Sequence, residues 1–275
     1  MLAYATIRTV RPCAVLLVLL LLANPGLGAQ DPLGDARRLY NAGQFEEAER
    51  AALAAVEAAG TANSARLVLG RIRLEQYRRA PHGSALADAR MAFRQVDPRG
   101  LEPRERMELT LGFAETLFLE DRFAAAAEMF TPILNSSGQL GAAAHERVLD
   151  WWATALDRHA QTRPMIERAP VYARIAERMQ AELTRDPGSI PAGYWVVAAA
   201  RASGDLDGAW NAATAGWIRA VLGRDGGVIL RGDLDRLVVQ AIIPERAARL
   251  SPKDSSVAVA GLLGEWEAFK AGWTR

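Results

Sequence analysis

The stretch LFLEDRFAAAAEMFTPIL, residues 117–134, places Asp121, Arg122 and Phe123 between two apolar runs. A similar stretch, LYNAGQFEEAERAALAAV, starts at Leu39, with glycine in place of the aspartate and phenylalanine two residues later. In both stretches the apolar residues recur at intervals of three and four, which is typical of amphipathic helices. The sequence therefore predicts a helical hairpin that occurs more than once.

Three copies of this pattern can be aligned with identical internal spacing, at offsets of 78 and 83 residues. Each copy has a turn-forming residue, an apolar residue two positions later and an alanine three positions further on. These residues are Gly43, Phe45 and Ala48; Asp121, Phe123 and Ala126; and Gly204, Leu206 and Ala209. The repetition predicts an array of similar units, each of which buries its apolar face against its neighbours.

The rest of the chain supports an all-α fold. No window alternates apolar and polar residues over the length of a strand. Prolines fall between the periodic segments and are expected to separate helices: Pro98, Pro103, Pro164, Pro170, Pro187, Pro191, Pro244 and Pro252. The adjacent residues Trp151 and Trp152 project about 100° apart on a helix, so both are expected to pack in a core with helices on two sides.

The aligned pattern resembles the tetratricopeptide repeat, a helical hairpin of about 34 residues. The resemblance implies a right-handed superhelical solenoid over residues 30–275, with about five repeats in 30–220. Residues 221–275 would form a divergent repeat and capping helices, with a helix over Ser255–Trp273. Extra residues are expected near Tyr77 and before Tyr172. A kink or break is expected at Pro244, because proline in a helix interior costs about 3 kcal/mol.

The same resemblance suggests a binding surface. In the tetratricopeptide family, protein and peptide partners usually lie along the concave groove lined by the first helix of each hairpin. The corresponding residues here would be Arg37, Tyr40 and Asn41; Glu115, Phe118 and Leu119; and Tyr194, Ala198 and Arg201. This set lacks the lysines and asparagines with which some family members bind a C-terminal carboxylate.

The first 29 residues are typical of an export signal. Arg8 and Arg11 precede an apolar run over residues 14–23, and small residues follow up to Ala29. Ten apolar residues are too few to cross a bilayer as a helix, so we expect cleavage near Ala29 and no integral membrane span afterwards. The compartment would be the periplasm of a Gram-negative cell. The alternative is an uncleaved N-terminal membrane anchor.

Charge and composition argue against several classes of function. The 33 Lys and Arg residues, less Arg8 and Arg11, leave 31 basic against 32 acidic residues, which gives no basic surface for nucleic acid. The only cysteine, Cys13, lies within the expected signal. His82, His145 and His159 lack metal-site spacing and are expected to be exposed or capping residues. No cofactor is expected.

Two short motifs have simpler explanations than ligand binding. The run GRDGGV from Gly223 lacks the lysine and the following Ser or Thr of a phosphate-binding loop, and a helix end with a loop is expected. Asp233 and Asp235 are not followed by the oxygen ligands of a calcium loop, so Asp233 is expected to cap a helix N-terminus.

These observations predict a non-catalytic module that binds a protein or peptide and leave its oligomeric state open. Two alternatives remain. The first is a structural subunit of a cell-envelope assembly that uses its convex face and C-terminal segment, which a broad apolar patch there would favour. The second is a helical accessory domain of an envelope enzyme, such as a glycosidase, which a buried Glu115 with a perturbed pKa in a cleft would favour.

Overall fold

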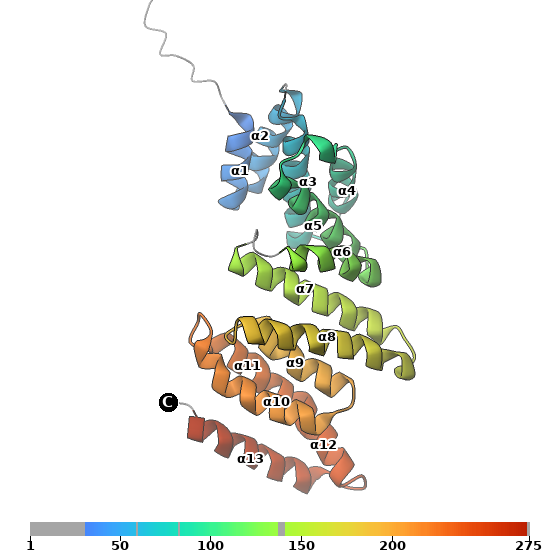
Figure 1. Cartoon of the computed structure of the whole chain (residues 1–275), viewed down its shortest axis with the longest axis vertical. Coiled ribbons are helices and arrows are strands. Elements are labelled where there is room, and N and C mark those ends of the chain that lie inside the picture. Colours follow the sequence, from blue (N-terminus) through green and yellow to red (C-terminus); the bar gives the residue numbers. More distant parts are fainter. Residues whose placement is uncertain (1–30, 59, 82, 137–140, 274–275) are drawn as a thin grey trace, which may run out of the picture.

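A computed structural model describes residues 31–58, 60–81, 83–136 and 141–273, and these ranges contain helices and no strand. Figure 1 shows the helices stacked in chain order along the long axis of the molecule. The all-α fold class is therefore confirmed. The expected export signal over residues 1–29 and His82 lie outside the described residues.

The helices differ in length from three residues to twenty-one. Their bounds are α1 Pro32–Asn41, α2 Phe45–Glu57, α3 Ala62–Arg79, α4 Ala85–Arg94, η1 Pro98–Gly100, α5 Pro103–Leu119, α6 Phe123–Asn135, α7 Ala142–Gln161, α8 Met165–Arg185, α9 Ile190–Ala202, α10 Leu206–Arg219, η3 Ala220–Leu222, α11 Val228–Leu237, η4 Val238–Ile242, α12 Ile243–Leu250 and α13 Ser256–Trp273.

Consecutive helices pack in adjacent pairs: α1 with α2, α3 with α4, α5 with α6, α7 with α8 and α9 with α10. Some odd-numbered helices also contact the next odd-numbered helix: α1 with α3, α3 with α5, α7 with α9 and α9 with α11. Helices α1, α3 and α5 thus lie beside one another, as do α7, α9 and α11, and the side of the molecule that these six helices form is called the odd-helix face below.

The three aligned turns have the same backbone conformation. Gly43, Asp121 and Gly204 are left-handed, with φ of 73°, 57° and 87°. At Asp121 the N–H donates to the Phe118 carbonyl at 3.1 Å, and the Arg122 N–H donates to the Leu117 carbonyl at 2.8 Å. The equivalent pairs of bonds occur at the other two turns, and this pattern is the Schellman motif that ends many helices. The first helix therefore stops at each turn because the chain enters the left-handed region.

The alanines that follow these turns lie where paired helices meet. Ala48, Ala126 and Ala209 are completely buried. A methyl group is the smallest side chain that still fills such a contact, so alanine lets the two backbones approach closely. The apolar residue of the turn packs nearby, since Phe45 and Leu206 are buried and Phe123 is half-buried. The predicted hairpins are thus present at all three positions.

The tryptophans lie mainly in the core. Trp152, Trp195, Trp210, Trp217 and Trp266 are buried, Trp151 is half-buried against Phe130, and Trp273 is half exposed. Helix α13 packs on α12 and α10, and its fully buried Trp266 meets the rings of Trp210 and Trp217 edge to face. The helix expected over Ser255–Trp273 is confirmed.

One expectation about proline needs correction. Pro170 does not precede its helix but lies inside α8, as the sixth residue. At that position proline removes one intrahelical hydrogen bond, the one to the Ile166 carbonyl in the first turn of the helix.

At Pro244, where a kink or break was expected, the regular α-helix is interrupted by the π-helical turn η4, in which the Ile243 N–H donates to the Val238 carbonyl, and α12 follows directly. The wider π-helical turn accommodates the proline, which has no N–H to donate.

Candidate functional site

Three hollows follow one another along the odd-helix face. The N-terminal hollow, about 560 Å³, lies among α1, α3 and α5. The middle hollow, about 170 Å³, shares Tyr40, Arg71, Arg104 and Glu108 with it and reaches α7. The C-terminal hollow, about 640 Å³, lies among α7, α9 and α11 and shares Arg147 with the middle one. The shared residues show that the three hollows are neighbours along one face of the molecule.

Five of the residues predicted to face a groove line these hollows. Arg37, Tyr40 and Asn41 belong to the N-terminal hollow, Glu115 to the middle hollow and Tyr194 to the C-terminal hollow. These positions come from the first helices of three different hairpins. Distant parts of the sequence are therefore brought to one face.

The remaining predicted residues lie elsewhere, because they belong to the last turn or the inner side of their helices. Phe118 packs edge to face on Phe123 at 5.5 Å between ring centroids. Leu119 packs against the core around Phe93, and Ala198 against the core of the neighbouring hairpins. Arg201 forms a two-pronged ion pair with Glu245 of α12, with its Nε 3.1 Å from both carboxylate oxygens. None of these four lines the three hollows.

Ion pairs between odd-numbered helices span the N-terminal hollow. Arg37 of α1 contacts Glu105 of α5 at 2.5 Å, and Arg71 of α3 contacts Glu108 of α5 at 2.8 Å. The Arg71 guanidinium also lies over the Tyr40 ring, 4.6 Å from its centroid. Burial raises the pKa of Tyr40, and Arg71 partly offsets this. These ion pairs therefore join the helices that form the walls of the hollow.

The middle hollow is organised in the same way around Arg78. Its guanidinium contacts Glu75 and Glu115, each at 2.6 Å, and lies over the Trp151 ring at 4.7 Å. Burial raises the pKa of the Glu115 carboxyl, although Arg78 acts in the opposite direction. One arginine thus connects α3, α5 and α7.

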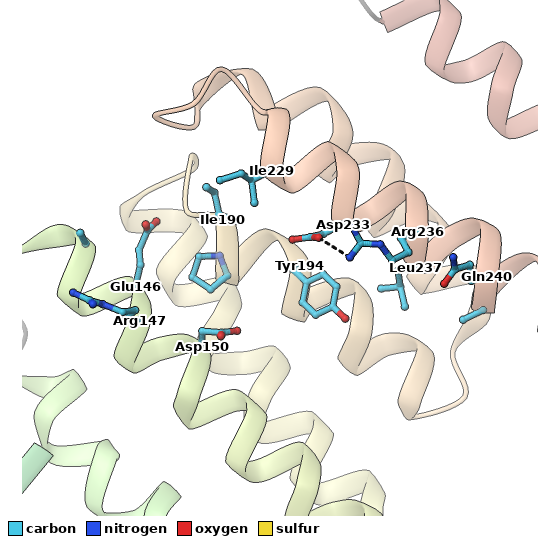
Figure 2. A pocket seen from close by; sticks show the side chains of 13 residues that line it. Glu146, Arg147, Asp150, Ile190, Tyr194, Ile229, Asp233, Arg236, Leu237 and Gln240 are labelled. Carbon is cyan, nitrogen blue, oxygen red and sulfur yellow. Dashed lines mark hydrogen bonds and ion pairs between the residues drawn. The ribbon is translucent and has the colours of Figure 1, made fainter. Parts of the chain in front are cut away.

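The C-terminal hollow has a floor and two walls (Figure 2). Helix α9 supplies the floor with Ile190, Pro191 and Tyr194, while α7 and α11 supply the walls. Much of the lining is apolar: Ala143, Ile190, Pro191, Tyr194, Ile229, Leu237 and Ala241. Such a mixture of apolar lining and a few charged groups is common in ligand sites.

The charged groups of the C-terminal hollow are paired less completely. Asp233 contacts Arg236 at 3.2 Å within α11, and Asp150 accepts a 2.8 Å hydrogen bond from the Trp195 indole. Glu146 has no ion pair with any residue that the structure describes. Burial raises the pKa of the Tyr194 phenol, and the nearby carboxylates of Asp233 and Asp150 raise it further. Three carboxylates, of Glu146, Asp150 and Asp233, and two arginines, Arg147 and Arg236, therefore line this hollow.

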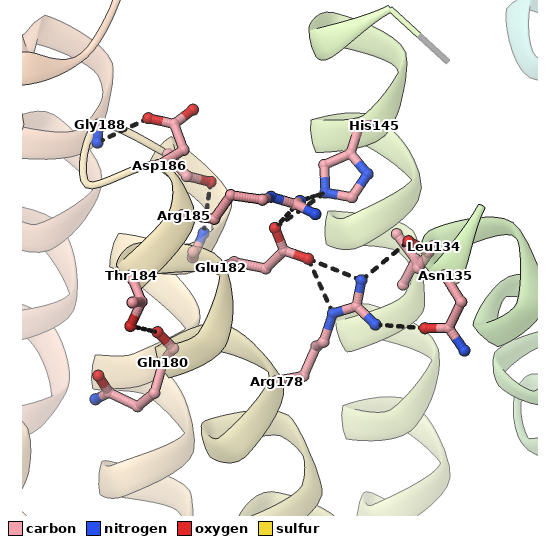
Figure 3. Close-up of polar contacts among 12 residues, drawn as sticks. Leu134, Asn135, His145, Arg178, Gln180, Glu182, Thr184, Arg185, Asp186 and Gly188 are labelled. Atoms are coloured by element: carbon pink, nitrogen blue, oxygen red, sulfur yellow. Dashed lines mark hydrogen bonds and ion pairs between the residues drawn. The ribbon is translucent and has the colours of Figure 1, made fainter. Parts of the chain in front are cut away.

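A buried polar cluster joins α7 and α8 (Figure 3), and it corrects the expectation that His145 is exposed or capping. His145 is buried, with its Nε2 3.1 Å from Glu182 Oε2. Glu182 is also buried and contacts Arg178 at 2.7 Å and Arg185. Burial acts to raise the pKa of Glu182, but the hydrogen bonds from His145 and Arg178 outweigh it and hold this pKa below its usual value. The histidine is buried because a carboxylate on the next helix meets its ring.

Other sequence expectations are settled by local geometry. Asp233 lies inside α11 and does not cap it; Asp225 accepts from the Gly227 and Ile229 N–H groups instead. Gly226 and Gly227 are left-handed, as suits the expected loop. Among the residues that the structure describes, no cluster of His, Cys, Asp and Glu could hold a metal ion, and no described helix is long and apolar enough to span a membrane.

The fold and the site together define an all-helical protein of paired helices with three neighbouring hollows on one face. Comparisons of the chain with protein-family models, with curated proteins and with solved structures found no match.

Proposed function

We propose that this protein is an exported, non-catalytic module that binds a protein or peptide along the odd-helix face. In this proposal the helical pairs form a right-handed solenoid of the tetratricopeptide type, and the odd-helix face is its concave side. The three matching left-handed turns and the buried alanines after them support this arrangement. N-terminal sequencing of the protein from a periplasmic fraction would test export and cleavage near Ala29 against an uncleaved anchor.

One observation carries the binding proposal: three neighbouring hollows follow one another from α1 to α11. Such a series of hollows suits an extended or helical segment of a partner better than a compact small molecule, because several helices contribute to it in turn. Solenoids bind partners on such extended surfaces.

Site-specific photocrosslinking in cells would test the proposal. A photoreactive amino acid would replace Asn41, Arg104 or Arg147, which are exposed residues of the odd-helix face. Matched exposed positions on even-numbered helices are Glu46, Arg94 and Glu177. We expect one discrete partner to crosslink from the first set. Crosslinks from the second set alone would replace the proposal with the envelope-assembly subunit, which would use the opposite face.

One observation favours an enzyme as a second candidate function. Glu115 is largely buried in a hollow, and burial raises its pKa, as a general acid requires. However, its Oε2 accepts from Arg78 at 2.6 Å, and this contact favours the charged carboxylate. Purified protein should therefore release no reducing ends from cell-wall glycan. Release that is abolished by Glu115→Gln would establish the enzyme instead.

A further inference from the structure

The apolar part of the C-terminal hollow continues onto an exposed surface. Ile229 lines the hollow and is 54 % exposed, and Val228 beside it is 75 % exposed. Val221 and Leu222 are also exposed, and the Leu222 carbonyl lies against Gly188, just before Ile190 of the floor. Aliphatic side chains therefore extend from the floor of the hollow to its rim. Burying such a rim would stabilise a complex by about 25 cal/mol per Å² of apolar surface.

The acidic part of the hollow lies on α7. Glu146 and Asp150 are four residues apart, so they project from the same side of the helix. Like charges at this spacing disfavour the helix by roughly 0.2–0.5 kcal/mol. Neither carboxylate forms an ion pair with any residue that the structure describes, although Asp150 is held by the Trp195 indole. A cation bound between them would relieve this repulsion.

The arginines of the hollow do not cancel this charge. Arg236 is paired with Asp233 on its own helix. Arg147 is exposed and also lines the middle hollow, and Figure 2 shows its side chain extending away from Tyr194. The Tyr194 ring, half-buried on the floor, offers a face to which a cation can bind.

We propose that the C-terminal hollow binds a short segment of a partner protein in which an aliphatic side chain stands beside a lysine or arginine. The aliphatic group packs on Ile190, Pro191 and Ile229, and the cation lies between the α7 carboxylates and Tyr194. This inference rests on the binding function proposed above for the odd-helix face. The volume of about 640 Å³ is within the usual range of about 300–1,000 Å³ for ligand sites.

The test uses the purified protein and three fluorescein-labelled nine-residue peptides, measured by fluorescence anisotropy at low salt. The first peptide alternates three leucines with two lysines between Gly-Ser ends, the second replaces lysine by glutamate, and the third replaces leucine by serine. We expect the leucine-lysine peptide to bind about tenfold more tightly than either of the others. Equal binding of the leucine-lysine and leucine-glutamate peptides, or no binding up to about 1 mM, would overturn the inference.

Variants of the protein assign the binding to this hollow. The double variant Glu146→Gln/Asp150→Asn should weaken binding of the leucine-lysine peptide about tenfold. The asparagine side-chain oxygen can still accept the hydrogen bond from the Trp195 indole. The control Glu46→Gln/Glu177→Gln removes the same charge from α2 and α8 and should change nothing.

A second matched pair tests the apolar contact. Ile229→Ser should weaken binding several-fold, and Ile166→Ser, at an 88 % exposed residue of α8, should not. Unchanged affinity in both hollow variants would overturn the inference.

The outcomes also separate this inference from the broader function. If Asn41 and Arg104 still crosslink a partner in cells while the peptide fails, the charge-specific inference is wrong and binding on the odd-helix face stands. If neither crosslinking nor peptide binding occurs, both are wrong.

Discussion

The N-terminal and C-terminal hollows lie on the same face of the same helical stack, yet their charges are partnered differently. In the N-terminal and middle hollows, Arg37, Arg71 and Arg78 each pair with a glutamate of α5. In the C-terminal hollow, Glu146 and Asp150 form no ion pair with any described residue, and the one internal pair, Asp233 with Arg236, joins neighbours on one helix. The first two hollows use their charges to hold helices together, whereas in the C-terminal hollow Glu146 and Asp150 take part in no ion pair between described helices.

Under the proposed function, this difference would separate stability from binding on one scaffold. A charge pair that bridges two helices restricts their relative position, and breaking it leaves a buried group unpaired. An exposed carboxylate that bridges nothing adds little to stability but remains available to a partner. The two regions should therefore respond in different ways to loss of a charge.

Arg78→Met should produce the largest effect. It leaves Glu115, whose side chain is 12 % exposed, without its cation, and we expect the free energy of unfolding to fall by roughly 2–4 kcal/mol. The matched change Arg236→Met removes an exposed pair of the C-terminal hollow and should cost less than about 0.5 kcal/mol. Urea denaturation would measure both.

The double variant Arg78→Met/Glu115→Gln provides the control. Because it removes both charges, it should recover more than half of the loss caused by the single change. If Arg78→Met and Arg236→Met lowered the free energy of unfolding equally, the ion pairs of the two hollows would contribute equally to stability. That result would contradict the comparison.

A second prediction concerns what the two regions share. Ala126→Leu and Ala209→Leu each add bulk at a completely buried hairpin contact, one in each half of the molecule. Both should lower the free energy of unfolding by about 1–3 kcal/mol, as overpacking does. Thermal unfolding would measure this, with the exposed Ala125→Leu as the control. An unchanged melting temperature would contradict the repeat alignment.

The hairpins could be predicted from the sequence because their signals are local. The turn residue, the apolar residue and the alanine recur at a fixed spacing. The residue type at each position indicates the backbone conformation or the burial of that same position. The accommodation of Pro244 could not be predicted in the same way. A proline shows that one hydrogen bond is missing, but the choice between a break and a π-helical turn depends on packing, and here Ile242 and Ile243 are completely buried.

The site was predictable only in part. The resemblance to the tetratricopeptide repeat implied that Arg37, Tyr40, Asn41, Glu115 and Tyr194 face a groove, and these five residues line the hollows.

The pairing of charges involves residues far apart in the chain, such as Arg71 with Glu108 or His145 with Glu182, and no local pattern reports it. The four-residue spacing of Glu146 and Asp150 was a usable signal for the C-terminal hollow, since like charges on one side of a helix need an explanation.

A third prediction uses the turns that begin the second helix of each pair. Asp121 is left-handed with φ of 57°, which is unfavourable for a residue with a side chain. Asp121→Gly should raise the free energy of unfolding by roughly 0.5–1 kcal/mol, whereas Gly204→Ala at the equivalent turn should lower it by a similar amount. Chemical denaturation would measure both, and changes of the same sign would contradict the equivalence of the turns.

The smallest expected effect is a difference in the sign of pH dependence between Glu115 and Glu182. The pKa of Glu115 is raised above 4.5 by burial, so its contribution favours folding below that pH and is lost as pH rises through the folded-state pKa. The pKa of Glu182, on the partner helix of α7, is held below 4.5. Its contribution is therefore present above pH 4.5 and is lost as pH falls through the folded-state pKa.

Denaturation curves of the wild type, Glu115→Gln and Glu182→Gln across the acidic range would separate the two. As the pH falls, the stability of the wild type relative to Glu115→Gln should rise, and its stability relative to Glu182→Gln should decline. The same trend in both comparisons would mean that burial does not dominate at Glu115. The middle hollow would then hold an ordinary ion pair, and the contrast with Glu146 and Asp150 of the C-terminal hollow would rest on pairing alone.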